Sequence, residues 1–109
     1  MDADLERICF GMISSGGESR SLIFEALMEA KQGKIKEARE LIKKSHQPSV
    51  EAHKLQMEML TKEARGENIG SSVLLVHAQD ILMATVTERD LATFMIDLFE
   101  EIWKQKALK

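Results

Sequence analysis

The 109-residue sequence predicts an all-α protein: an antiparallel, up-down-up bundle of three helices in a single domain, residues 1–109. Apolar residues recur at spacings of three and four through three long stretches, which is the period of an amphipathic helix. The chain has one proline and no tyrosine, and it is rich in Ala, Leu, Glu, Lys and Met, which favour helix. Stretches of about 30 residues form rods about 45 Å long, and short connections make consecutive rods antiparallel.

The first helix is expected from about Asp4 to Gln32, where Gly33 is well placed to end it. Gly16 and Gly17 are unusual inside it, because each costs up to about 1 kcal/mol relative to alanine in a helix. Either the helix bends at this pair, or another backbone packs so closely that no side chain fits. The sequence leaves both explanations open.

The second helix is expected from about Lys34 to Arg65, with Pro48 inside it. Proline removes a backbone donor and pushes against the carbonyl four residues earlier, so a kink or a break is predicted near residues 44–47. Residues 66–72 form a linker that ends in a serine cap. The third helix follows from about Val73 to Lys106.

The first half of the third helix is apolar nearly all round. At 100° per residue, one face carries His77 among apolar residues, and the opposite face is apolar as far as Val86. The residues around His77 are Val73, Leu74, Ile81, Ala84, Leu91 and Met95. A helix in a three-helix monomer needs only one buried stripe, so this pattern predicts self-association through residues 73–86.

His77 and Asp80 are the chemically unusual residues of this segment, three positions apart on neighbouring parts of one face. Asp80 has two possible roles: it holds the Nδ1–H of His77 and leaves Nε2 free as a nucleophile, or it meets its symmetry mates at an oligomer axis. In the second role the repelling carboxylates need a cation or a proton. A satisfied interface histidine with a hydrogen-bonded aspartate explains the spacing as well.

Charge and composition exclude several classes of protein. The net charge of −3 and the pI near 5.6 argue against a nucleic-acid partner, which calls for a basic excess. The single cysteine, Cys9, permits no intrachain disulfide and no Cys-based zinc cluster. The acidic start is unlike a signal peptide, and no apolar run approaches the ~20 residues that span a bilayer. We therefore expect a cytoplasmic protein without direct membrane insertion.

The segment Leu74–Met83, LLVHAQDILM, resembles the signature of the lactose/cellobiose-type enzyme IIA components of the bacterial phosphoenolpyruvate-dependent sugar phosphotransferase system. Two weaker blocks agree with it, GESRS at residues 17–21 and AHKLQ at residues 52–56. The resemblance extends from about Leu5 to Trp103. Systems for lactose, cellobiose and chitobiose-type sugars share this block, so it does not identify the sugar.

The resemblance implies a homotrimer, a nine-helix bundle, acting as a phosphotransferase component. The histidine matching His77 takes a phosphoryl group from the phosphohistidine of HPr and passes it to a cysteine of the cognate IIB. The aspartate matching Asp80 is associated with a metal at the threefold axis, usually Mg²⁺. No organic cofactor and no sugar site are implied.

One position departs from the family pattern: Ile81 stands where the family commonly has a second histidine, one helical turn after His77. Gln56 and His53 of the second helix are our candidates for supporting the phosphoryl group on His77. Two alternatives remain: a helical adaptor that associates through its third helix without chemistry, and a metal-dependent trimer without phosphoryl transfer.

Overall fold

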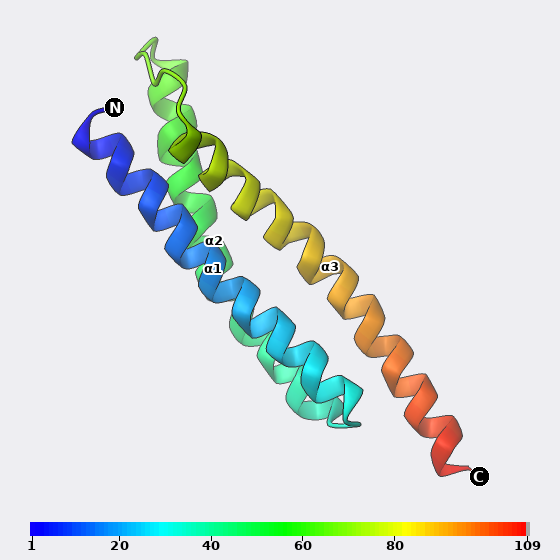
Figure 1. Ribbon diagram of the computed structural model, residues 1–109. Helices are drawn as coiled ribbons and strands as arrows, with labels where there is room; N and C mark the ends of the chain where they lie inside the picture. Colours follow the sequence, from blue (N-terminus) through cyan, green and yellow to red (C-terminus); the bar gives the residue numbers. More distant parts are fainter. Residues whose placement is uncertain (109) are drawn as a thin grey trace.

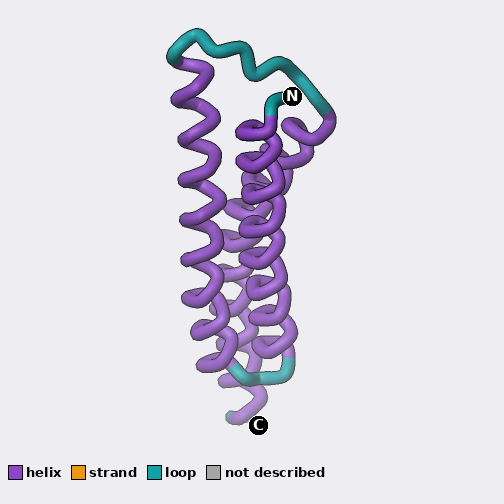
Figure 2. The backbone as a smooth tube through the Cα atoms, turned by 90° about the vertical axis from the view of Figure 1, so that its left-hand side faces the viewer, coloured by secondary structure: helices purple, strands orange, loops and turns teal. Residues whose placement is uncertain are grey.

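The computed structural model describes residues 1–108 and confirms the predicted three-helix bundle (Figure 1). The helices are α1, Ala3–Lys31, α2, Ile35–Ala64, and α3, Val73–Ala107. One connection lies at each end of the bundle, so α1 and α3 run in the same direction and α2 runs against them (Figure 2). The molecule is a rod whose Cα atoms extend 62 × 20 × 15 Å. No described helix combines the length and apolar character needed to cross a membrane.

The helix ends lie within about two residues of the predicted positions, because the local signals act as expected. The Asp2 carboxylate accepts the backbone N–H of Leu5 at 2.8 Å, which caps α1. Gly33 ends the turn after α1 with φ +86°, a conformation that side chains oppose. The Ser72 hydroxyl accepts the N–H of Leu75 at 3.1 Å and starts α3.

The core runs along the bundle axis in two clusters. The cluster near the N-terminus is built from all three helices and includes Cys9, which is fully buried. The other members are Leu5, Ile8, Met12, Ala52, Met59, Ala78 and Leu82. The second cluster is formed by Ala26, Ala30, Ala38 and Ile96 near the α1–α2 turn, where three alanines allow close helix packing.

Helix α2 continues through Pro48, so the break allowed by the sequence does not occur. Proline removes only the hydrogen bond to the carbonyl of residue 44, and the neighbouring turn is held from α1. The buried Ser19 hydroxyl donates to the backbone carbonyl of Ser45 at 2.8 Å. Pro48 and Ser49 are themselves buried, so packing of this turn compensates for the missing bond.

The two adjacent glycines of α1 have different environments, and the helix continues through both. Gly16 is buried, and a Cβ built on it would lie 2.8 Å from Cγ2 of Ile81 on α3. The close neighbour is therefore a side chain, where the sequence had suggested another backbone. Apart from the nearby backbone of α1 itself, no described atom lies within 4 Å of a Cβ built on Gly17.

The C-terminal end of α3 packs on the α1–α2 turn through Trp103. A Cβ on Gly33 would lie 3.1 Å from the indole ring, so the turn and the ring are in close contact. The Lys106 ammonium lies 5.0 Å from the ring centroid, within cation–π range.

Candidate functional site

Helix α3 buries one side against α1 and α2 and leaves an apolar side open. The buried side consists of Ala78, Leu82, Thr85, Ala92 and Ile96. On the opposite side, which we call the outer face of α3, Val73 is 87% exposed and Phe94 is 74% exposed. The other exposed apolar residues of the outer face are Val76, Met83, Leu91, Met95, Leu98 and Ile102.

The outer face confirms that α3 is apolar on two sides, but it differs from the predicted face in extent. It continues to Ile102, well beyond the predicted limit at Val86. Leu74 and Ile81, which we had grouped with His77, are instead half-buried, and Leu74 packs on the core. The centre of the exposed face is therefore turned from His77 toward Asp80.

His77 and Asp80 both lie exposed on the outer face. Within the described residues, neither a hydrogen bond nor an ion pair joins the two side chains. The structure thus does not place Asp80 as the orienting partner of the His77 ring. An exposed imidazole on a rigid helix is open to a second protein, which a histidine nucleophile serving protein partners requires.

Gln56 lies on the other side of α3 from His77. Its Nε2 donates to Oε1 of Gln79 at 2.7 Å, and Gln79 is about 200° around the helix from His77. His77 lies instead toward α1, since Ile81, one turn later, contacts Gly16. The structure brings Gln56 and Gln79 together but does not bring Gln56 to His77 of the same chain.

His53 is exposed on α2, one turn before Gln56. The sequence predicted no role for Gln79, although it lies within the HAQD block between His77 and Asp80. The helical wheel gives its rotation of about 200° from His77, and the bond to Gln56 shows that this side of α3 faces α2.

No group of three His, Cys, Asp or Glu side chains in residues 1–108 is arranged to hold a metal ion. Asp80 offers one carboxylate per chain, and a hard cation such as Mg²⁺ takes several oxygen ligands. The oxygen chemistry fits such an ion, but one chain does not supply enough ligands at this position.

The family model described as "PTS system, Lactose/Cellobiose specific IIA subunit" matches residues 7–100. This chain belongs to that family. The relationship predicted from the HAQD block is therefore confirmed over most of the chain, including α3 as far as residue 100.

Relatives of this IIA protein agree in sequence and in fold. The lichenan-specific phosphotransferase enzyme IIA component of Bacillus subtilis is 39% identical over 106 residues, covering 97% of this chain and 96% of the relative. The crystal structure of a cellobiose-specific enzyme IIA from Bacillus anthracis superposes with a TM-score of 0.90 at 44% identity, covering 95% of this chain and 94% of that one. A chitobiose IIA of Escherichia coli, solved in complex with HPr, matches with a TM-score of 0.72 at 36% identity, covering 90% and 95%.

Proposed function

We propose that this IIA protein is a phosphoryl carrier whose acceptor is His77. It takes the group from phospho-HPr and passes it to a cysteine of a cognate IIB during uptake of a lactose-, cellobiose- or chitobiose-type sugar. The observation that carries the proposal is the exposed His77 imidazole in the HAQD block of α3. A IIA relative that was solved bound to HPr supports HPr as the donor. The cytoplasmic location stays a prediction.

The transfer needs little covalent work from the protein. A neutral His77 nitrogen attacks the phosphorus, its N–P bond forms, and the N–P bond to the donor histidine breaks. The same nitrogen is the leaving group when the IIB thiolate attacks. Because the transition state is loose, catalysis consists of positioning and of stabilising about two negative charges.

The outer face of α3 supports the homotrimer as part of this proposal. Exposed Val76, Met83, Phe94 and Leu98 form a stripe along the helix, and Asp80 lies within it. Packing three copies of this stripe around an axis buries the apolar residues and brings three Asp80 carboxylates together. Three converging carboxylates require a cation or protonation, and Asp80 would then be the Mg²⁺ ligand.

In such a ring the support for His77 comes from the next copy. In a ring of three identical copies, each contact joins two different surfaces. The side of α3 that faces α1 in one copy therefore meets the side that faces α2 in its neighbour. Rotation about an axis parallel to α3 keeps each residue at the same height along the bundle. Because Gln79 is only two residues from His77, the Gln79 of one copy lies at nearly the same height as the His77 of the next. Gln56, its bonded partner Gln79 and the nearby His53 would therefore approach His77 of the adjacent chain.

Phosphorylation with phosphoenolpyruvate, enzyme I and HPr tests the carrier function. We expect one acid-labile, alkali-stable phosphoryl group per chain by mass spectrometry, and none on His77→Gln. His46→Gln is the matched control, because it removes an exposed histidine of α2 whose ring nitrogen lies 3.2 Å from the Arg89 guanidinium. Equal labelling of His77→Gln would refute the assignment, and an unlabelled parent would favour the adaptor alternative.

Mixed trimers test the support from the next copy. His77→Gln and Gln56→Ala chains are labelled separately and then after mixing and reassembly. Random assembly restores His77 beside an intact Gln56 in about a quarter of the sites, so the mixture should label faster than either variant alone. A rate equal to the mean of the two variants would show that Gln56 does not support His77 of an adjacent chain.

Chelation tests the metal. If Asp80 binds Mg²⁺ at the axis, a chelator lowers the melting temperature of the parent, and Asp80→Asn abolishes that effect. A parent insensitive to chelation would exclude a stabilising metal at this position.

A further inference from the structure

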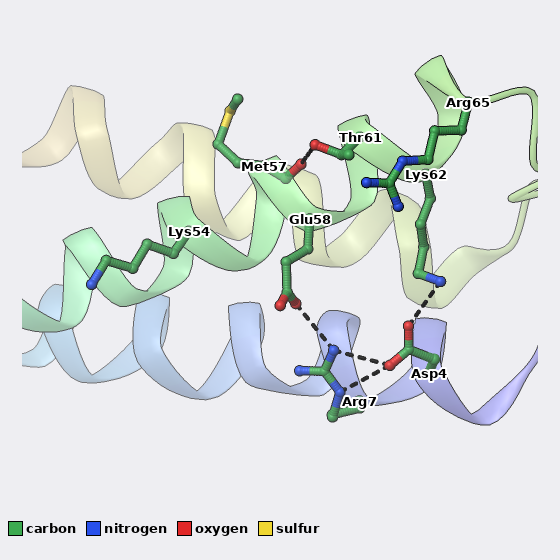
Figure 3. Close-up of a pocket in the computed structure, with 8 residues that line it drawn as sticks. All are labelled: Asp4, Arg7, Lys54, Met57, Glu58, Thr61, Lys62 and Arg65. Carbon is green, nitrogen blue, oxygen red and sulfur yellow. Dashed lines mark hydrogen bonds and ion pairs between the residues drawn. The ribbon is translucent and has the colours of Figure 1, made fainter.

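A charged hollow of about 430 Å³ lies between the start of α1 and the last three turns of α2 (Figure 3). It is lined by residues of α1, α2 and the Arg65 cap of α2, and by no residue of α3. It is therefore separate from the outer face of α3 and from His77. Neither the proposed transfer nor the proposed trimer uses it.

The hollow is positive in a chain that is negative as a whole. Four cationic and two anionic side chains line it, so its formal charge is +2, whereas the chain carries −3. The cations are Arg7, Lys54, Lys62 and Arg65, and the anions are Asp4 and Glu58.

Two of the cations neutralise both carboxylates. The Arg7 guanidinium contacts Asp4 and Glu58 at 3.0 Å each, and the Lys62 ammonium contacts Asp4 at 2.9 Å. These pairs leave Asp4 and Glu58 little attraction for the remaining cations. The excess charge of the hollow therefore belongs to Lys54 and Arg65.

Lys54 and Arg65 lie at opposite ends of the hollow, with Met57 and Thr61 between them (Figure 3). Lys54 has only a 3.5 Å contact to Glu51, and Arg65 has no ion pair to another described residue. Eleven residues of helix separate their Cα atoms by about 16 Å. A ligand that contacts Lys54, Met57 and Arg65 together must therefore extend along α2.

We propose that this hollow binds an acidic, extended segment of a partner protein along α2. Side chains about four residues apart in an extended chain point to the same side and are about 13 Å apart, so two such carboxylates reach both long cationic side chains. Met57, 47% exposed, offers apolar contact midway, and Arg and Met are enriched in protein interfaces. The proposal does not rest on the carrier function, because the hollow and His77 share no residue.

The probe is a capped peptide with two glutamates about four residues apart, an even spacing that points both side chains to the same side of an extended chain. Its glutamine counterpart is the control. Binding is followed at low salt through backbone amide shifts of the full chain. We expect saturable shifts confined to the hollow, weakening as salt rises because the contacts are exposed. The glutamine peptide should leave these signals unchanged.

Charge-matched variants locate the binding. Lys54→Gln with Arg65→Gln should weaken peptide affinity about tenfold, the loss expected for two exposed ionic contacts. Lys36→Gln with Lys43→Gln removes the same charge at the other end of α2 and should change affinity less than about twofold. Circular dichroism confirms that both variants fold.

Three results would overturn the proposal. Equal weakening by the two double variants would show a general charge effect. No saturable binding of the glutamate peptide would show that the hollow does not take an acidic segment. Competition by inorganic phosphate at the peptide's own concentration would identify a small-anion site instead.

Discussion

Alanine at Gly16 and alanine at Gly17 should change stability in opposite directions, although the two residues are adjacent in one helix. Both substitutions remove the helix penalty of glycine, about 0.8–1 kcal/mol each. They differ in what the new methyl group meets. At Gly17 it meets no described atom within 4 Å apart from the nearby backbone of α1, whereas at Gly16 it would lie 2.8 Å from Cγ2 of Ile81.

The magnitude at Gly16 follows from that contact. Ordinary carbon contacts start near 3.5 Å, so α1 and α3 must separate locally or Ile81 must leave its rotamer. Isoleucine is stiff at χ1, and overpacking of this kind costs about 1–3 kcal/mol. Subtracting the helix gain leaves Gly16→Ala destabilised by about 1 kcal/mol, while Gly17→Ala is stabilised by about 0.5–1 kcal/mol.

Thermal unfolding followed by circular dichroism, at one fixed protein concentration, measures the difference. The expected separation between the two variants is about 5–10 °C for a chain of this size. The double variant Gly16→Ala with Ile81→Ala should show favourable coupling, because the smaller side chain removes the clash. Equal melting temperatures for the single variants, or no coupling in the double variant, would refute the assigned contact.

Three further outcomes test other features. Burial raises the pKa of the Cys9 thiol, so Ellman's reagent at neutral pH should leave the native protein unmodified and label one thiol after denaturation. Ser19→Ala should lower the free energy of unfolding by about 1 kcal/mol in chemical denaturation, because it removes the buried hydrogen bond to the Ser45 carbonyl. The control Ser14→Ala, at an exposed position, should change the free energy of unfolding by less than about 0.5 kcal/mol. Hydrogen bonds from Lys62, and then from Arg7, hold the pKa of Asp4 below its ordinary value of 3.8. The ionised Asp4 therefore stabilises the folded protein at pH values above 3.8, and this contribution is lost as the pH falls through the lower pKa of the folded state. Asp4→Asn should therefore flatten the acid side of the melting curve plotted against pH, and an unchanged acid slope would contradict the ion pair.

The helices and their ends were predictable because their signals are local. Asp2, Gly33 and Ser72 act on the backbone within three residues of themselves, so their effect can be read without knowing the fold. The spacing of apolar residues is also a local signal, and it predicted that α3 is apolar on two sides. The family, too, was predicted from a contiguous block around His77 and is confirmed.

Features that depend on a neighbouring helix were not predictable in the same way. The turn of α2 before Pro48 is contacted by Ser19, 29 residues away in sequence, and Gly16 is in close contact with Ile81. Gln56 was predicted to support His77 of the same bundle from its position in the sequence. Its orientation on α2 instead places it in a hydrogen bond with Gln79. The roles of His77, Gln56, His53 and Asp80 stay predictions, since they concern other molecules.

The packing of Trp103 on Gly33 gives the protein an intrinsic optical reporter. This indole is the only one in the chain, and it touches the α1–α2 turn from the far end of α3. Its fluorescence therefore reports selectively on whether that end of α3 is docked, at a site remote from His77. Without any added dye, quenching and emission wavelength can distinguish fraying of the helix end from loss of the whole bundle.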